Sequence, residues 1–344
     1  MRNYGARRFH NSVKCFQREV FDRKLKRNQR EWSLKVNDSE YYDYLRSEAS
    51  YQLVSRLEDI SRKFPKALDI GCHRGHILKS LITHSTEVEQ FGVIGGIQNL
   101  VQCDSTLAGV EASKEVAIKQ IKDNNFPLEV ETIQVDEELI ENYIHEDECF
   151  DLVTSSMNLH WVNNIPSALR QIHRILKPDG AFVGCLLGGD TLKELRHCLY
   201  LAEMERDGGF SPHVSPLTRP SDVAGLLQGA GFALPTVDIE TVTIGYPDAF
   251  VLMEHLQRMG EGNASFARRF PVGKDTFVAA AALYESLYPS EEDDGIKATF
   301  QLIYMIGWKP HASQPKPMPR GSATHKLTQL SDLQKETVPE KKEK

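Results

Sequence analysis

A glycine-spaced turn at residues 67–75 constrains this chain more than any other segment. The stretch reads Ala-Leu-Asp-Ile-Gly-Cys-His-Arg-Gly, an apolar run that ends at Asp69 and is followed by Gly71 and Gly75. A helix-like segment, 77–83, comes directly after it. Small residues in such a strand–turn–helix unit let backbone N–H groups and the helix N-terminus approach a nucleotide. The turn therefore predicts an α/β fold with a nucleoside pocket at the end of the first strand.

Apolar runs and helical patterns alternate along the chain after this turn. Strands are predicted at 66–70, 100–103, 129–135, 150–155, 180–187, 236–245 and 299–308. Helices are predicted at 17–33, 39–62, 77–83, 113–122, 165–176, 191–206, from 221 to about 229, 250–259 and 276–288. Strands that alternate with helices indicate right-handed crossovers and a mostly parallel sheet.

Four acids follow the ends of the first three strands, and their order suits S-adenosylmethionine (SAM). Asp69 could meet the ammonium group of SAM, Asp104 its ribose hydroxyls, and Asp136 or Glu137 its adenine amino group. SAM-dependent methyltransferases usually carry three glycines at alternate positions of the turn, and here the middle one is replaced by His73. The predicted cofactor-binding residues are Asp69, Gly71, His73, Gly75, Asp104, Asp136 and Glu137.

His73 raises two questions, one about SAM and one about metals. Its side chain occupies space that a close backbone approach requires, so we expect it to lower the affinity for SAM. The sequence shows no partner for His73 at metal-ligand spacing. His145-Glu146-Asp147 has the His-x-Asp spacing of some iron sites, but its acidic surroundings favour a solvated loop. The sequence therefore predicts no metal site.

Polar residues near the fourth and fifth strands are the candidates for catalysis. Asn158 and His160 follow the fourth strand, whereas Asp190 and His213 lie in the segment from 188 to 216 after the fifth. This segment should form a helix and loop over the mouth of the pocket. Its predicted helix carries an acidic face of Glu194, Glu203 and Glu205, which would suit a positively charged partner or would simply be solvated.

Charge divides the chain into a basic start and an acidic body. Residues 1–30 contain ten Lys and Arg against two acids, although the net charge of the whole chain is −7. The acidic body argues against nucleic acid as a partner. The acid-free residues 1–18 are typical of a mitochondrial targeting segment, with a solvated basic tail as the alternative. The six cysteines form no Cys-x-x-Cys pair, which suits a reducing compartment, and no apolar stretch is long enough to span a bilayer.

Several further segments carry a family resemblance. They are residues 20–23, 159–163, 188–196, 202–203, 208–216, 307–311 and 320–323. Together they resemble a branch of the class I methyltransferases whose members assist the assembly of mitochondrial complex I. The resemblance covers roughly residues 20–325. It implies a Rossmann-like fold with a mostly parallel seven-stranded sheet, a helical N-terminal extension and helical lid insertions.

The same resemblance implies an unusual activity for this fold. Members of the branch are regarded as arginine hydroxylases that act on the iron–sulfur-cluster-bearing small subunit of complex I, at the matrix face of the inner membrane. Hydroxylation needs a redox centre, because side chains alone do not insert oxygen into a C–H bond, and the sequence identifies no such oxygen-activating cofactor. The alternatives are a SAM-dependent methyltransferase of a protein or small molecule, and a non-catalytic assembly factor.

The expected organisation follows from these observations. Residues 1–35 form the targeting segment and a basic helix, 36–310 the methyltransferase-like domain, and 311–344 a disordered tail. Lid segments lie at about 188–220 and 246–295. The expected partners are the complex I subunit and other assembly factors, with peripheral contact at the inner membrane and no transmembrane segment.

Overall fold

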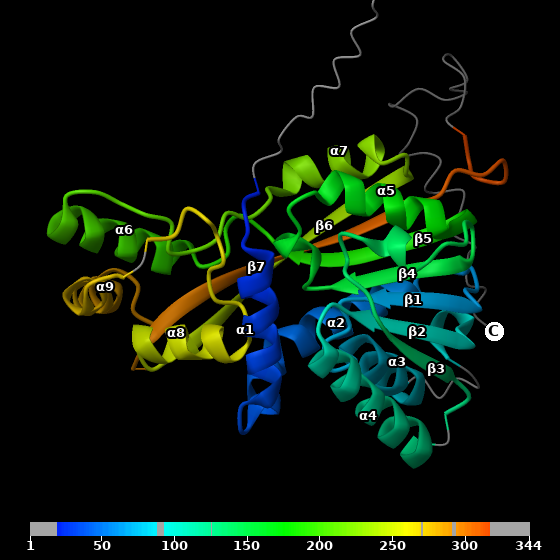
Figure 1. Cartoon of the computed structure of the whole chain (residues 1–344), viewed down its shortest axis with the longest axis horizontal. Coiled ribbons are helices and arrows are strands. Elements are labelled where there is room, and N and C mark those ends of the chain that lie inside the picture. The colour runs from blue at the N-terminus through cyan, green and yellow to red at the C-terminus, as the bar shows by residue number, and fades with distance from the viewer. Residues whose placement is uncertain (1–18, 88–92, 125, 270, 291–293, 317–344) are drawn as a thin grey trace, which may run out of the picture. The chain divides into compact units, whose positions relative to one another are not determined.

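The computed structural model of the chain describes residues 19–87, 93–124, 126–269, 271–290 and 294–316. Its contacts divide the chain into Met1–Pro310, which holds the whole sheet, and His311–Lys344. The sheet has seven strands in the order β3-β2-β1-β4-β5-β7-β6 (Figure 1). The strands are β1 (Lys66–Ile70), β2 (Asn99–Asp104), β3 (Glu129–Gln134), β4 (Phe150–Ser156), β5 (Leu176–Leu187), β6 (Ala233–Tyr246) and β7 (Ile296–Trp308). Strands β1 to β5 pair in parallel, whereas β7 runs antiparallel to β5 and β6, and the predicted fold class is confirmed.

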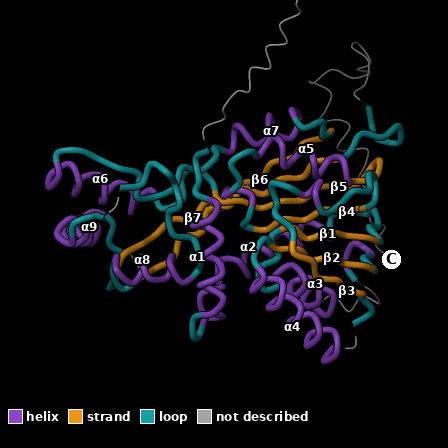
Figure 2. Tube along the Cα trace, viewed as in Figure 1, coloured by secondary structure: helices purple, strands orange, loops and turns teal. Residues whose placement is uncertain are grey.

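The helices follow the predicted order along the chain, as Figure 2 shows by element type. They are α1 (Arg23–Lys35), α2 (Tyr44–Glu58), α3 (His76–Glu87), α4 (Leu107–Asn124), α5 (Ile165–Ile175), α6 (Lys193–Asp207), α7 (Pro220–Gly229), α8 (Ala249–Arg258) and α9 (Lys274–Leu287). Short 3-10 turns add η1 (Ser39–Asp43) and η4 (Leu159–Trp161). None of the helices in the described part of the chain is long and apolar enough to cross a membrane.

Alternating side chains of the central strands form two separate apolar cores. Ala67 of β1 and Leu100 of β2 belong to the core that α2, α3 and α4 cover. Their neighbours Leu68 and Val101 belong to the core that α5 and α7 cover on the other face. Because successive side chains of a strand point to opposite faces, a parallel sheet between two helical layers needs apolar residues at nearly every position. This requirement explains why the strands were easy to predict from uninterrupted apolar runs.

Strands β6 and β7 extend beyond the rest of the sheet and carry the lid. The pairing of β7 with β5 spans Leu302 to Trp308, whereas its pairing with β6 begins at Ile296. The first residues of β7 therefore form a two-stranded extension. Helices α6, α8 and α9 pack on this extension, where Ala298 and Phe300 join their apolar core (Figure 1). This arrangement places the lid beside the end of the fifth strand.

The predicted basic helix is present as α1, and it packs on the domain. Asp22 caps its first turn by accepting a hydrogen bond from the Leu25 backbone N–H at 2.9 Å. Lys26 and Arg30 are buried, although both carry charged groups. The helix contacts α4 and α8. Residues 1–18, on which the targeting prediction falls, and residues 317–344 of the predicted tail lie outside the described residues.

Candidate functional site

The glycine turn after β1 has the backbone conformation that its sequence requires. Gly71, His73 and Gly75 all have positive φ angles, of 73°, 50° and 69°. Histidine tolerates this region better than β-branched residues do. The backbone N–H groups of Gly71 and Cys72 both donate to the Cys103 carbonyl, at 2.8 and 2.9 Å. The turn is therefore fixed against the end of β2, as in a nucleotide-binding strand–turn–helix unit.

Two of the predicted acids lie at this turn and already have partners. Asp69 is fully buried and accepts a hydrogen bond from Thr154 Oγ1 at 3.1 Å, and burial raises its pKa to about 7. Asp104 Oδ2 accepts the His73 backbone N–H at 3.1 Å. Asp104 Oδ1 accepts both the backbone N–H and the hydroxyl of Thr106, at 2.8 and 2.7 Å. The carboxylate expected to hold a ribose thus binds its own loop.

The other two acids pair with α1. Asp136 accepts hydrogen bonds from Arg23 and Arg27 at 3.0 and 2.8 Å. Glu137 is buried and lies 2.7 Å from Arg23 Nη1 and 3.8 Å from Arg30 Nη1. Burial alone would raise the pKa of Glu137, but these guanidinium groups outweigh it and lower the pKa. The positions predicted to meet adenine are therefore occupied by arginines of the chain itself.

Side chains fill the remaining space at the turn. A Cβ atom added at Gly71 would lie 2.2 Å from Asn158 Cγ, so the Asn158 side chain occupies the approach that glycine leaves open. Arg30 donates to the Asn158 side-chain oxygen, and Arg46 donates to the Met157 carbonyl at 3.2 Å. The cavity left beside Gly71 and Asp69 measures about 10 Å³, which is enough for about one water molecule.

This arrangement does not fit SAM. Pockets for ligands of that size usually measure about 300–1,000 Å³. Asp69, Gly71 and His73 line this small cavity, and Asp104 holds the His73 backbone beside it. Binding of SAM would require Asn158, Arg30 and Arg46 to move.

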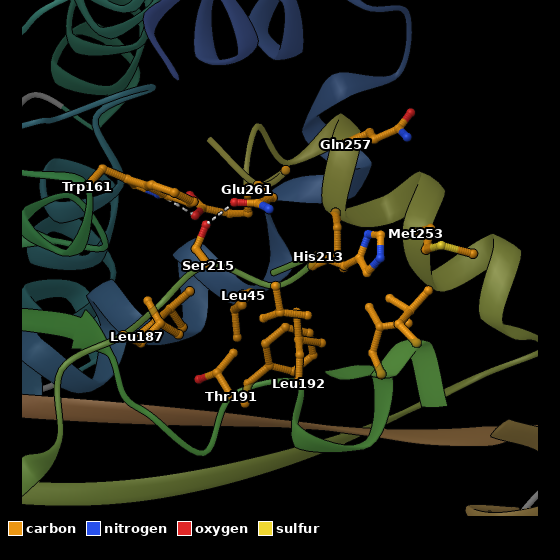
Figure 3. A pocket seen from close by; sticks show the side chains of 18 of the residues that line it. Leu45, Trp161, Leu187, Thr191, Leu192, His213, Ser215, Met253, Gln257 and Glu261 are labelled. Atoms are coloured by element: carbon orange, nitrogen blue, oxygen red, sulfur yellow. Dashed lines mark hydrogen bonds between the residues drawn. The ribbon is translucent and has the colours of Figure 1, made fainter. Parts of the chain in front are cut away.

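A larger cavity lies under the lid (Figure 3). It measures about 180 Å³ and is lined mainly by apolar side chains of α6, α8, α9 and β7. Glu261 and Ser215 lie on one side of it, and Leu187, Thr191 and Leu192 lie on the opposite side (Figure 3). The cavity therefore combines an apolar wall with a few polar groups, which is the usual composition of a binding site.

Glu261 is the buried charge of this cavity. Trp161 Nε1 donates to its Oε2 at 2.7 Å, and His160 Nε2 lies 3.1 Å from the same oxygen. Arg46 pairs with its Oε1. Burial opposes ionisation, but Arg46 and the hydrogen bond from His160 outweigh it, so the pKa of Glu261 falls far below its usual range. Lys26 Nζ lies 3.3 Å from the centroid of the Trp161 ring.

The four predicted catalytic candidates fall into different places. Asn158 and His160 belong to the buried network between the turn and Glu261. His213 lines the lid cavity, and its Nε2 lies 3.1 Å from a Glu203 oxygen. Asp190 accepts a hydrogen bond from Gln301 Nε2 at 3.2 Å and is not one of the residues that line the cavity. Three of the four candidates, all except Asp190, thus lie at the lid cavity or in the buried network between it and the glycine turn.

The predicted acidic face of α6 is wrong for two of its three residues. Glu194 and Glu203 are 2% and 0% exposed, so neither is available to a partner or to solvent. Glu194 accepts hydrogen bonds from Thr299 of β7, and Glu203 accepts them from Ser211. Both acids turn inward because α6 packs on β7 and on its own following loop, whereas Glu205 remains exposed.

Two other predictions concern metals and lids. Asp147 of the His-x-Asp motif is exposed and pairs with Arg174, as expected of a solvated loop. Residues of the segment from 188 to 216 line the lid cavity, which is separate from the pocket at the turn that the prediction named. No local pattern in the sequence points to Arg30 or Arg46, and the only local signal for Glu261 is its place between two glycines of a loop.

Known proteins with similar sequences and structures identify first the fold class and then the family of this chain. Residues 41–237 match the model of a methyltransferase domain family, so the chain belongs to the methyltransferase-fold proteins. The crystal structure of the YcgJ protein from Bacillus subtilis covers 77% of this chain and 99% of its own, with a TM-score of 0.50 and 17% sequence identity, which shows the fold alone.

Relatives that are similar over most of the chain show to which branch of the methyltransferase-fold proteins it belongs. The mitochondrial arginine hydroxylase NDUFAF5 of Danio rerio is 44% identical over 316 residues, which is 92% of this chain and 91% of the relative. The protein of the same name in Homo sapiens is 43% identical over 323 residues, 94% of this chain and 86% of the relative. A malonyl-[acyl-carrier protein] O-methyltransferase of Nitrosospira multiformis is 34% identical over half of this chain. The chain therefore belongs to the NDUFAF5 family of arginine hydroxylases, a family built on a methyltransferase fold.

Proposed function

We propose that this chain hydroxylates an arginine side chain of a protein partner, the small complex I subunit that carries an iron–sulfur cluster, early in complex I assembly. The observation that carries the proposal is the identity of 43–44% to arginine hydroxylases over more than nine-tenths of the chain. Oxygen insertion needs a redox centre that side chains do not supply.

The lid cavity supports arginine as the target. Its volume of about 180 Å³ is below that of pockets for drug-sized ligands and suits a single long side chain. Apolar residues such as Leu195 and Leu199 can pack along the methylene stem. Glu261 is the one carboxylate among the described residues that line the cavity, and its negative charge would favour a guanidinium group, which would share the carboxylate with Arg46.

The closed turn weighs against the main alternative. A SAM-dependent methyltransferase needs a pocket for SAM, and the space at the turn is about 10 Å³. A non-catalytic assembly factor would need neither pocket. Mass spectrometry of the partner subunit after incubation with this chain separates the three possibilities. One added oxygen atom on an arginine supports hydroxylation, one added methylene supports methylation, and an unchanged mass supports a binding role only.

A cavity-filling variant tests where the arginine binds. Leu195→Phe adds volume inside the lid cavity, so we expect arginine modification to fall at least tenfold, by about 1.4 kcal/mol or more of binding free energy. Leu287→Phe changes a residue of α9 that is 46% exposed and should leave modification unchanged. Equal activity of Leu195→Phe and the parent chain, with both folded, would place the arginine site elsewhere.

We further propose that the chain works in the mitochondrial matrix, peripherally at the inner membrane, together with other assembly factors. Support comes from the mitochondrial relatives and from the basic residues 1–18. Replacing Arg2, Arg7 and Arg8 by Glu reverses the charge on which import depends, so the variant should remain outside the matrix in an import assay. Unchanged delivery would refute the targeting role of this segment.

A further inference from the structure

A cluster of Asp43, His73 and His76 lies beside the glycine turn, and the proposed reaction does not use it. One ligand-capable atom of each residue lies within 4.8 Å of the other two, and this is the one such trio found in the described parts of the chain. Asp43 Oδ1 lies 4.0 Å from His73 Nδ1, and Asp43 Oδ2 lies 3.6 Å from His76 Nε2. The two imidazole rings are nearly parallel, with centroids 5.7 Å apart.

Four polar atoms of this cluster are buried without hydrogen-bond partners, namely Asp43 Oδ2, both ring nitrogens of His73 and His76 Nε2. Asp43, His73 and His76 are only 6%, 4% and 5% exposed. Both ring nitrogens of His73 and Nε2 of His76 have no hydrogen-bond partner. Buried polar atoms nearly always have one, so a group of unpaired atoms that face each other needs an explanation. Arg74 Nε lies 3.0 Å from Asp43 Oδ2, which balances the carboxylate charge but leaves the ring nitrogens unpaired.

We propose that Asp43, His73 and His76 bind a divalent transition-metal ion through one carboxylate and two imidazoles. Two donor atoms that bind one ion at about 2.0–2.2 Å each lie no more than about 4.4 Å apart. Each histidine nitrogen lies within this limit of one Asp43 oxygen, His73 Nδ1 at 4.0 Å from Oδ1 and His76 Nε2 at 3.6 Å from Oδ2, and all three pairs lie within 4.8 Å. Two imidazoles and one carboxylate with open positions form the donor set of non-haem iron(II) sites.

The surroundings of the cluster also suit a metal. Ser47 Oγ lies 3.3 Å from His76 Nδ1, so a hydrogen bond there would hold the ring with Nε2 directed at Asp43. Such a contact behind a histidine ligand is usual at metal sites. A cavity of about 10 Å³, enough for about one water molecule, borders His73 and His76. The nearby Arg46 and Arg74 are positively charged, so we expect weaker binding than at a structural zinc site.

The metal site stands apart from the proposed function. The proposal is only that the three residues bind an ion, and it assigns this ion no role in arginine hydroxylation. A metal of this class is nevertheless one kind of redox centre that hydroxylation requires. Arginine modification should therefore be measured separately, with and without iron(II), so that the two proposals can fail independently.

The test uses the purified full chain after treatment with a chelator. Calorimetry with Zn²⁺, visible absorption with Co²⁺ and anaerobic titration with Fe²⁺ should each give one ion per chain. Asp43→Asn, His73→Gly and His76→Gln should each weaken binding at least about 100-fold, because loss of a ligand exceeds loss of an outer contact. His84→Gln is the matched control, since His84 is a buried histidine of α3 that pairs with Glu58 at 2.7 Å, and it should bind metal like the parent chain.

The variant His73→Gly separates loss of a metal ligand from loss of the fold. Because the φ angle of His73 is 50°, glycine suits this position, so the variant should fold and loss of metal cannot be ascribed to unfolding. Absence of binding to the folded parent chain up to millimolar metal would overturn the proposal. So would parental affinity in both His73→Gly and His76→Gln.

Discussion

The glycine turn and the lid cavity differ in what fills them. The turn is lined by charged and hydrogen-bonding side chains and leaves about 10 Å³, whereas the lid cavity is mainly apolar and leaves about 180 Å³. The turn keeps the backbone that suits a nucleotide, but Asn158, Arg30 and Arg46 occupy the space in front of it. A backbone turn that suits a nucleotide therefore does not guarantee a free binding site, because side chains from distant segments decide whether the site is open.

One ion pair joins the two regions. Arg46 lines the small cavity at the turn, and its partner Glu261 lines the lid cavity. Their side chains are 4% and 3% exposed, so water cannot solvate one charge when the other is removed. Disruption of this pair should produce the largest effect among the changes considered below.

Arg46→Met should lower the free energy of unfolding by about 3–5 kcal/mol, because it leaves the Glu261 charge buried and unpaired. Urea denaturation measures this loss. The control is Arg258→Met, whose pair with Glu254 is partly exposed and should cost less than about 1 kcal/mol. Similar losses in the two variants would show that the two regions are not coupled through Arg46.

Asp69→Asn should change how stability depends on pH. The pKa of Asp69 is 3.8 in the unfolded chain and about 7 when buried, so the folded state binds the extra proton between these values. Below about pH 4 Asp69 is protonated in both states and does not lower the free energy of unfolding. As the pH rises towards 7, ionisation in the unfolded state alone lowers the free energy of unfolding more and more. One pKa unit is worth about 1.4 kcal/mol, so the difference in unfolding free energy between parent and variant should change by up to about 4 kcal/mol across this range. A constant difference from pH 4 to 8 would contradict the buried environment of Asp69.

Gly71→Ala tests whether Asn158 closes the turn. The new Cβ would lie 2.2 Å from Asn158 Cγ at a φ angle of 73°, and the two effects should together cost about 2–4 kcal/mol of stability. Adding Asn158→Ala should recover the part that comes from the clash. Gly225→Ala in α7, where the new Cβ meets no atom within 4 Å, should instead be neutral or stabilising. Failure of the double variant to recover stability would mean that Asn158 does not fill the turn.

His73→Gly should give the smallest effect, on SAM affinity. It removes one obstacle, but Asn158 and Arg30 still occupy the site, so calorimetry should show a gain of less than about tenfold. A much larger gain would identify His73 as the main barrier to SAM. Affinity unchanged from that of the parent would show that the turn accommodates the imidazole.

The fold was predictable because each element has a local signal. Apolar runs indicate the central strands, alternation of polar and apolar residues indicates β6, and capping residues and helical periodicity indicate the helices. These local signals do not predict the ends of elements where contacts between distant residues determine them. The residues Lys177 to Gly180 resemble a turn after a helix, yet β5 already begins at Leu176, which pairs with Phe150 before a register shift. Helix α4 begins at Leu107, earlier than the predicted 113, because it starts directly after the loop that Asp104 holds.

The site was only partly predictable, because its deciding contacts join distant residues. Arg46 and Glu261 are 215 positions apart, and no local pattern connects them. The prediction overlooked His76, which lies three positions after His73, and the position of Asp43 beside both histidines depends on how η1 and α2 pack. The prediction of no metal site and the proposal of one are alternatives that the metal titration separates.

The strand order carries a consequence for how the molecule is made. Strand β7 is the last strand in the described part of the chain, yet it lies between β5 and β6, so these two have no partner on that side until residues 296–308 arrive. A chain that emerges from its N-terminus onward, from a ribosome or through a translocation pore, would spend that interval with two exposed rows of backbone N–H and C=O groups. Such open strand edges readily pair with other chains. Newly made molecules should therefore depend on chaperones until residues 296–308 are available to pair, and truncations that remove β7 should aggregate rather than merely lose activity.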